Sequence, residues 1–517
     1  MVNSIRNLDR LILFTLLVAM LWLSRDFGIT FDEGAQQTYG TMVVSFFESG
    51  FKNRESFTFL NLYLYGGFFD ALAVCVQRGF PIDIYDARHF LNAFIAWIGY
   101  VYAWKLGRAL GGAATGWWAL LLLLMSPMYF GHMANNPKDM PFASSYLASL
   151  YYIVIFTREL PTFRPKTLAK LITAIGLAIN MRVGGILLIC FWEMTLGLWI
   201  LHDWRQQKRL IWRRIMPIVA AAVLSPWAAL AFGTLGWPWA QWQPFLRPFQ
   251  ALTEMSHFNW LGILLFNGTK VSAGSLPWSY APLWFAVTTP LLVLLGILLA
   301  LVFSRNGRWW ELLFLTLAAV FPVFYVIIKH SVLYNGVRQL LFAYPPLVVV
   351  SAYGLHQTWC VAVKDSRWSW TGIAVLAGFA ACAFDPIAFS IRYHPNESNY
   401  FNSFVGGTRG AYGKFDLDYW GNCQKEAIHW IAAIARREQR TIKVSYDTPG
   451  HKYIELEVGQ PGIISFVDIK SDPDYLTYVI SPEDWDIEKM KSNKDIVYTV
   501  QADGAPLCAV LKGPTHL

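Results

Sequence analysis

The chain has 517 residues, of which 55% are hydrophobic, 16% aromatic and only 15% charged. That composition excludes an ordinary soluble domain and is typical of a polytopic membrane protein. The formal net charge of +8 could suggest a nucleic-acid-binding protein, but the basic residues lie mainly in short connectors between apolar runs. Anionic lipid and the insertion machinery favour that pattern in cytoplasmic loops. We therefore expect a lipid bilayer around the chain and no nucleic-acid partner.

Apolar stretches of about 18 residues or more predict about eleven transmembrane helices. The fifth and sixth form one long apolar run that residues 180–182 interrupt. The predicted spans are 9–26, 88–109, 113–131, 140–157, 167–181, 183–202, 214–233, 281–303, 309–328, 337–360 and 368–389.

Every second connector is rich in lysine and arginine, as in the run that holds Arg205, Lys208 and Arg209. Because such loops stay in the cytoplasm, the alternation predicts that the long loops 27–87 and 234–280 face outward. Residues 57–76 are apolar enough to resemble a further span. We interpret them as an interfacial or re-entrant segment, since their insertion would invert the charge bias of every later loop.

Two segments of the outer loops carry apolar residues at helical spacing. One runs from Tyr39 to Phe47 and the other from Phe245 to Met255. The spacing predicts amphipathic helices, which either lie on the bilayer surface or pack against the bundle.

The chain becomes polar from about residue 390, and no later run is long enough to cross a bilayer. A helical stretch at 424–437 precedes short β-rich runs at 441–446, 463–467, 475–480, 496–500 and 508–511. We predict a transmembrane domain over residues 1–389 and a small extracytoplasmic α/β domain over 390–517. Cys423 and Cys508 both fall in the tail, where they are either bonded or free, because pairing cannot be read from sequence.

Two short acidic motifs lie at corresponding places, after the first and third predicted spans. They are Phe31-Asp32-Glu33-Gly34 and Asn136-Pro137-Lys138-Asp139, and the predicted topology puts both on the outer face. Carboxylates are costly to keep where helices leave the bilayer, so they mark functional sites. Asp32 or Glu33 can take a proton from an acceptor hydroxyl. Alternatively, these acids cap the next helix, and Lys138 pairs only with Asp139.

Basic residues also gather at the outer ends of spans, where they can stabilise the charge of a leaving phosphate. The alternative is that the long cations only reach to lipid headgroups. His330 can equally stay neutral at the interface, and Tyr334 can be an interfacial anchor. The candidates are Lys138, Arg182, Lys329, His330, Tyr334 and Arg338.

Two further motifs complete a set: Tyr334-Asn335-Gly336-Val337-Arg338 before a late span, and residues 412–421, Tyr-Gly-Lys-Phe-Asp-Leu-Asp-Tyr-Trp-Gly, in the tail. With the two acidic motifs, they resemble bacterial membrane glycosyltransferases of the GT-C superfamily. That group is related to the dolichyl-phosphate-mannose protein mannosyltransferases and, more distantly, to the lipid A aminoarabinose transferase. The resemblance covers the whole chain loosely and the first four spans best.

The resemblance implies an inverting glycosyltransferase of the bacterial inner membrane, which takes a sugar from a polyprenyl-phosphate donor on the outer face. The family's catalytic acid matches Asp32, with Glu33 beside it, and its second acidic position matches Asp139. Lys138 and Arg338 match positions where the family places phosphate-binding cations. The resemblance does not decide whether Asp32, Glu33 or Asp139 holds a divalent metal ion. The acceptor is a protein, a glycan or a lipid, and the sequence does not choose among them.

Two other classes of protein would share the many spans. A secondary transporter or lipid flippase usually shows paired inverted halves with broken helices near the bilayer midplane. On inspection the chain shows neither, and its membrane-depth charges cluster at one face. A polysaccharide polymerase or ligase is the remaining alternative.

Overall fold

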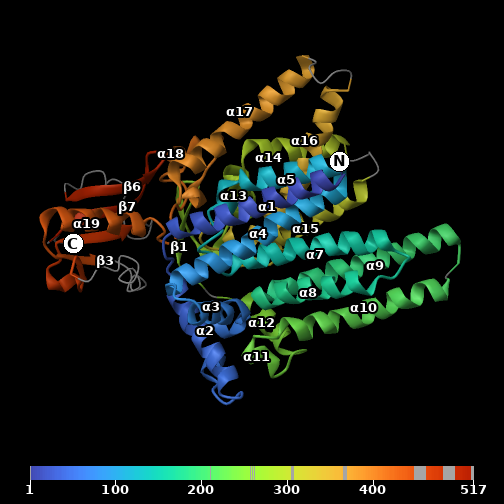
Figure 1. The fold of residues 1–517 in the computed structure, drawn as a ribbon, viewed down its shortest axis with the longest axis horizontal. Helices are drawn as coiled ribbons and strands as arrows, with labels where there is room; N and C mark the ends of the chain where they lie inside the picture. The colour runs from blue at the N-terminus through green and yellow to red at the C-terminus, as the bar shows by residue number, and fades with distance from the viewer. Residues whose placement is uncertain are drawn as a thin grey trace.

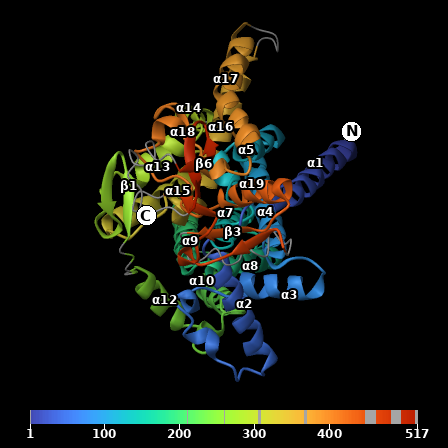
Figure 2. The same cartoon turned by 90° about the vertical axis from the view of Figure 1, so that its left-hand side faces the viewer.

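A computed structural model describes most of the chain. The described residues are 2–209, 211–256, 258, 260, 262–303, 308–364, 370–446, 462–480 and 495–513. Residues 368 and 369, at the start of the last predicted span, lie outside them. Figure 1 shows a bundle of long helices with a small sheet at one end and the N-terminus at the other. Figure 2, viewed from the sheet end, shows α19 and the strands in front of the bundle.

The bundle consists of helices that coincide with the predicted spans. Their bounds are α1 Val2–Leu23, α4 Ile84–Gly111, α5 Ala113–Leu124, α6 Pro127–Phe130, α7 Asp139–Glu159, α8 Pro165–Met181, α9 Ile186–Gln207, α10 Trp212–Gly233, α13 Tyr280–Thr288, α14 Leu291–Phe303, α15 Trp309–Ile328, α16 Tyr344–Ala362 and α17 Trp370–Tyr393. Among the described residues, six helices are long and apolar enough to cross a membrane, and a bent pair adds a seventh candidate. The protein is therefore a mainly helical, multi-pass membrane protein.

Two predicted spans are broken, and a proline explains each break. α13 and α14 meet at an angle of 109°, and Pro290 lies between them. α5 stops one turn before α6, which begins at Pro127. Proline lacks the backbone N–H and drives the residue before it out of the helical region. Thr289 and Ser126, which precede these prolines, are accordingly extended.

Small residues allow the bundle helices to approach closely. α14 and α16 meet at Gly296 and Gly354, where a side chain on Gly354 would collide with the carbonyl oxygen of Gly296. Membrane helices usually pack through such close contacts. The hydrophobic effect does not drive their association, because lipid tails are as apolar as the side chains.

The two long loops, 27–87 and 234–280, form short elements at the sheet end of the bundle. The first loop holds α2 Glu33–Glu48, 3-10 turns at Glu55–Phe57 and Leu62–Leu64, and α3 Phe68–Gly79. At about 1.5 Å per residue α3 is too short to cross a bilayer, so residues 57–76 form no continuous span, as predicted. The second loop holds α11 Pro238–Gln241, α12 Arg247–Ser256 and the antiparallel strands β1 Ile263–Phe266 and β2 Thr269–Ser272.

The two predicted amphipathic helices coincide with α2 and α12. In α2, Tyr39, Val43 and Phe46 are buried, so this stripe packs against the protein. Phe249 of α12 is 42% exposed. The first helix thus follows the packing alternative.

The tail contains α18 Gly407–Ala411, α19 Gln424–Glu438 and a five-stranded sheet in the order β4-β3-β5-β7-β6. The strands coincide with the five predicted β-rich runs: β3 Ile442–Tyr446, β4 Ile464–Phe466, β5 Tyr475–Val479, β6 Ile496–Ala502 and β7 Ala505–Lys512. β3 pairs in parallel with β4 and β5, whereas β7 is antiparallel to β5 and β6. A disulfide joins Cys423, before α19, to Cys508 in β7, and it decides between the two alternatives left by the sequence.

Candidate functional site

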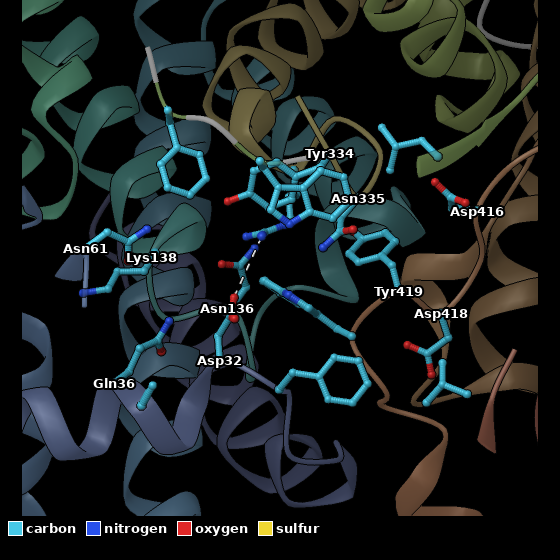
Figure 3. Close-up of a pocket in the computed structure, with 18 of the residues that line it drawn as sticks. Asp32, Gln36, Asn61, Asn136, Lys138, Tyr334, Asn335, Asp416, Asp418 and Tyr419 are labelled. Atoms are coloured by element: carbon cyan, nitrogen blue, oxygen red, sulfur yellow. Dashed lines mark ion pairs between the residues drawn. The ribbon is translucent and has the colours of Figure 1, made fainter. Parts of the chain in front are cut away.

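A cavity of about 590 Å³ lies where the loops 27–87 and 234–280 meet the tail. Five of the predicted site residues line it: Asp32, Lys138, Arg182, Tyr334 and Arg338. They come from five places in the chain: the start of α2, the loop before α7, the end of α8, the loop after α15 and the start of the 3-10 segment Arg338–Ala343. Figure 3 shows Asp32 and Asn136 near the middle, Lys138 and Gln36 on one side, and Tyr419 and Asp418 on the other.

Asp32 presents its carboxylate to the cavity. Its side chain is 47% exposed, and Oδ2 lies 3.9 Å from Nη2 of Arg338, the ion pair that is dashed in Figure 3. Asp32 precedes α2 but makes no capping hydrogen bond with its side chain. The cap alternative therefore does not describe Asp32, whose carboxylate is open to a ligand.

Glu33 points the other way and is completely buried. Its carboxylate accepts hydrogen bonds from the backbone N–H of Thr30 at 2.8 Å and from the Thr30 hydroxyl at 3.2 Å. It also lies 3.1 Å from Nε2 of His89. Thr30 thus donates twice to the glutamate three residues later, at the turn that leads into α2. The structure thus places Glu33 beneath the start of α2 and not in the cavity.

Asp139 lies behind the cations of the cavity. It is buried, and its carboxylate lies 2.5 Å from Nη2 of Arg182 and 3.5 Å from Nη1 of Arg338. Asn136 caps α7 by accepting from the N–H of Asp139, and its amide donates to Oδ2 of Asp139. One carboxylate therefore orients two guanidinium groups toward the cavity.

Lys138 does not pair with Asp139. Its Nζ lies 2.5 Å from Oδ2 of Asp70, whose other oxygen lies 2.7 Å from Nη2 of Arg88. All three residues are buried. Asp70 and Arg88 are not among the predicted site residues, although an acid inside the apolar segment 57–76 is a sequence signal for such a site.

Aromatic rings hold Arg338 in place. Its guanidinium carbon lies 4.4 Å from the ring centre of Trp420 and 5.0 Å from that of Tyr334, at distances typical of cation–π contacts. Asn335 and Gly336 have φ values of 57° and 65°, and this left-handed turn brings the chain from Tyr334 to Arg338. Tyr334 also stacks on Trp260, with centroids 4.8 Å apart.

The tail closes the cavity through Tyr419 and Trp420. The Tyr419 hydroxyl lies 3.3 Å from Nε2 of His132. Burial lowers the pKa of His132 to about 4, so the imidazole is neutral near pH 7 and adds no charge beside Arg338. The sequence motif over 412–421 contained these residues, but their roles became visible only in the structure.

Asn422 fastens three segments around the cavity. Its Oδ1 accepts from the N–H of Gly28 at 2.9 Å and from the amide of Asn135 at 3.0 Å. Its Nδ2 donates to the carbonyl of Pro395 and to Oδ1 of Asn396. The loop of Asp32, the loop of Lys138 and the tail are thereby held in one arrangement.

An apolar groove of about 450 Å³ adjoins the cavity. The two share Tyr65, Arg182, Phe258 and Tyr334 as lining residues. Leu252 and Met255 of α12 form part of its wall. A charged cavity and an apolar groove with a common arginine suit a ligand that has a charged head and a long apolar chain.

His330 is not in the cavity. It lines a separate hollow of about 70 Å³ with Trp278 and Leu276. Lys329 is exposed and does not line the cavity either. The structure therefore brings together the other predicted cations but not these two.

The carboxylates considered for a metal ion do not form a ligand cluster. In the described part of the chain, Asp32, Glu33 and Asp139 do not bring three possible ligand atoms within 4.8 Å of one another. A carboxylate oxygen of Asp418 and the sulfurs of Cys423 and Cys508 do lie that close together. However, those cysteines form the disulfide, and Asp418 accepts from the backbone N–H groups of Asn422 and Cys423. These residues do not fit a metal ion, because a bonded sulfur is no thiolate ligand.

No protein-family model matches the chain, and no curated protein matches it. Solved structures do. ArnT from Cupriavidus metallidurans, bound to undecaprenyl phosphate, is 13% identical with a TM-score of 0.49, over 98% of this chain and 99% of that one. Archaeal oligosaccharyltransferase AglB from Archaeoglobus fulgidus, in complex with an inhibitory peptide and a dolichol-phosphate, is 10% identical with a TM-score of 0.47, over 91% of this chain and 70% of that one.

The arabinosyltransferase EmbB from Mycobacterium smegmatis is 12% identical with a TM-score of 0.40, over 76% of this chain and 38% of that one. ArnT is the lipid A aminoarabinose transferase, which the motif resemblance names as a distant relative. Identities this low say nothing of the substrate, so the function has to come from the residues of the site.

Proposed function

We propose that the chain is an inverting glycosyltransferase, which moves a sugar from a polyprenyl-phosphate donor to an acceptor hydroxyl. One observation carries this proposal: the half-exposed carboxylate of Asp32 faces a cavity that also holds Arg338, Arg182 and Lys138. A base and a cluster of cations are the two parts that transfer from a phosphate leaving group requires. The motif resemblance to the GT-C superfamily supports the same reaction.

The donor would occupy both hollows at once. Its polyprenyl chain suits the apolar groove, and its phosphate suits Arg182, which lines both the groove and the cavity. Arg338 is held by Asp139 and Trp420, so little side-chain entropy is lost when it binds an oxygen. Planar guanidinium groups can bind phosphate through two parallel hydrogen bonds. The sugar would then lie in the cavity near Asp32.

The reaction is a single displacement at the anomeric carbon. The acceptor O–H gives its proton to the Asp32 carboxylate while the oxygen forms the new bond to the sugar. The bond between that carbon and the phosphate oxygen breaks, and polyprenyl phosphate leaves with the electron pair. Arg338 and Arg182 stabilise the charge that grows on this phosphate. Attack opposite the leaving group inverts the carbon, as in other single-displacement glycosyl transfers.

The alternating basic connectors support an outward-facing site, on the extracytoplasmic face of a bacterial inner membrane. The acceptor would enter from the aqueous side, past the loops 27–87 and 234–280. Protein, glycan and lipid hydroxyls all fit this chemistry. The division into a catalytic transmembrane domain over 1–389 and an accessory α/β domain over 390–517 belongs to the same proposal.

Purified full-length protein in detergent tests the reaction. It is supplied with short-chain polyprenyl-phosphate sugars, as a panel of pentoses, hexoses and amino sugars, and with an envelope extract as acceptor. Release of polyprenyl phosphate without any ion gradient, lost in Asp32→Asn, is the expected result. Movement of an intact donor across proteoliposomes, with no bond cleaved, would instead support a flippase.

A further inference from the structure

A second hollow, with charged residues in a largely apolar wall, lies at the opposite end of the bundle from the candidate site. It is a groove of about 490 Å³ between α1, α4 and α7, lined by Asp9, Arg10, Leu13, Trp104, Lys105, Arg108 and Ile155 among others. Arg88 of α4 is near the candidate site, and Lys105 follows it by 105 − 88 = 17 residues on the same helix. At about 1.5 Å per residue this is a separation of about 25 Å, close to the thickness of the hydrocarbon core.

The groove carries an excess of positive charge. Arg10, Lys105 and Arg108 line it together with one acid, Asp9. That acid is already paired, because its Oδ2 lies 2.8 Å from Nη1 of Arg108. Two further carboxylates lie nearby. Glu311 is paired with Arg158 and Arg308, and Glu159, which interacts with Tyr151 of the groove wall, is paired with Arg164.

Lys105 is left without an acid in the described part of the chain. Its ammonium lies 4.6 Å from the ring centre of Tyr102, and Lys170 of α8 adds a second positive charge nearby. Arg10 is exposed beside it. A half-buried cation at a membrane interface, next to two further cations, favours an anion as its partner.

The walls indicate what kind of anion this is. Leu13, Val101 and Ile155, one from each of the three helices, contribute apolar side chains to the groove. α1 continues from it with an exposed apolar face along its length, in which Leu11 and Phe14 are both 61% exposed. A soluble phosphate would leave that face uncovered, whereas the acyl chains of a lipid would lie along it.

We propose that this groove binds the headgroup of an anionic phospholipid, at the membrane face opposite the candidate site. The phosphodiester would lie between Lys105 and Arg10, and the acyl chains would lie along α1. Basic pockets between transmembrane helices on the cytoplasmic side are the usual binding sites of such headgroups. This site does not depend on the proposed transferase activity.

Native mass spectrometry of the full-length protein tests the proposal, with phosphatidylglycerol and phosphatidylcholine of the same acyl chains as probes. The wild type should retain phosphatidylglycerol in preference. The double variant Arg10→Gln/Lys105→Gln should lose about thirtyfold in affinity for it, because two cations beside the headgroup are removed. Its affinity for phosphatidylcholine should not change.

Arg205→Gln/Lys208→Gln is the matched control, since both residues are basic, exposed and outside the groove. An equal loss in this control, or equal retention of both lipids by the wild type, would overturn the proposal. Glycerol 3-phosphate at the same concentration should not displace the lipid; displacement would indicate a site for a soluble anion. If the double variant does not fold, the single variant Arg10→Gln, at an exposed position, is tested in its place. Its affinity for phosphatidylglycerol should fall while its affinity for phosphatidylcholine stays unchanged.

Discussion

Arg338 joins a buried carboxylate to an accessible one. Its Nη1 lies 3.5 Å from Oδ2 of Asp139, which is 2% exposed, and its Nη2 lies 3.9 Å from Oδ2 of Asp32, which is 47% exposed. The buried acid fixes the guanidinium, and the guanidinium in turn faces the acid that a ligand can reach. The aspartates of the two acidic motifs therefore have different tasks: Asp139 positions the cations, while Asp32 remains available for proton transfer.

The first prediction separates Asp32 from Glu33. Asp32→Asn keeps the shape of the side chain but removes the basic oxygen, so transfer should fall by about a hundredfold or more. The thermal unfolding temperature should stay close to that of the wild type, because the side chain makes no capping hydrogen bond and is half exposed. Turnover of a short-chain donor and a thermal melt measure the two effects.

Glu33→Gln is the comparison, and its defect should be mainly in stability, because the buried carboxylate holds Thr30 and His89. An active Asp32→Asn enzyme with a folded but inactive Glu33→Gln enzyme would move the base to Glu33. Activity in both would contradict the mechanism.

The second prediction concerns the phosphate site. Arg182 lines both the cavity and the groove, so Arg182→Met should lower turnover by about a hundredfold through loss of a charge-assisted contact. Lys329→Met is the matched control at an exposed position outside the cavity, and its turnover should be normal. Steady-state rates over a range of donor concentrations provide the measurement; a normal rate in Arg182→Met would leave that residue as a headgroup anchor.

The third prediction tests the buried triad of Asp70, Arg88 and Lys138. Asp70→Asn leaves two cations without their carboxylate, which should cost about 3–5 kcal/mol of stability. Lys138→Met in the same chain removes one of those cations and should recover part of the loss. Unfolding of the two single variants and the double variant gives the coupling; additive losses would mean that Lys138 and Asp70 do not interact.

Much of this arrangement could be predicted from the sequence, because its signals are local. Apolar runs located the bundle helices, and alternation located all five strands of the tail. Pro127 and Pro290 are equally plain in the sequence. The predicted spans 113–131 and 281–303 nevertheless run through them, because those spans rest on length and hydropathy alone. Five of the nine candidate site residues line the cavity.

The rest depended on packing between distant segments. Neighbouring residues at a helix start point about 100° apart, and only contact with Thr30 and His89 decides that Glu33 is the buried one. The pairing of Lys138 with Asp70 spans 68 residues. The contact of Trp420 with Arg338 likewise could not be predicted, because it depends on where the tail folds back against the bundle.

The fourth prediction is a dependence of stability on pH. His394 lies 2.5 Å from Oε1 of Glu397 and 3.1 Å from Oδ2 of Asp26, and the ring of Phe27 packs against it. Burial lowers the pKa of His394, but the bonds to Glu397 and Asp26 outweigh it and raise the pKa above its usual value. Burial likewise raises the pKa of Glu397.

Both shifts have the same sign for stability. A raised pKa means that the folded protein binds more protons than the unfolded chain, so this contribution is present at low pH and is lost as pH rises through the folded pKa. Unfolding temperature should therefore fall from about pH 6 upward, more steeply in the wild type than in His394→Asn. Parallel curves for the two proteins would contradict the prediction.

The last prediction concerns topology, on which the outward-facing site depends. Single cysteines in a background without Cys75, Cys190, Cys360 and Cys382, with the Cys423–Cys508 disulfide kept, report which side of the membrane a loop faces. Thr58, Trp278 and Ser471 are exposed positions in the two outer loops and the tail. Cysteines there should react with an impermeant thiol reagent in intact spheroplasts. Gln206 is exposed and lies in a basic connector, so it is the control for the cytoplasmic side. A cysteine there should react only after the membrane is opened, because positively charged loops remain in the cytoplasm. If the cysteines at positions 58 and 471 reacted from opposite sides, the first loop and the tail would lie on different faces of the membrane. The hydrogen bonds of Asn422 to Gly28 and Asn135 do not permit that arrangement. If all three outer positions reacted only after the membrane was opened, the site would face the cytoplasm.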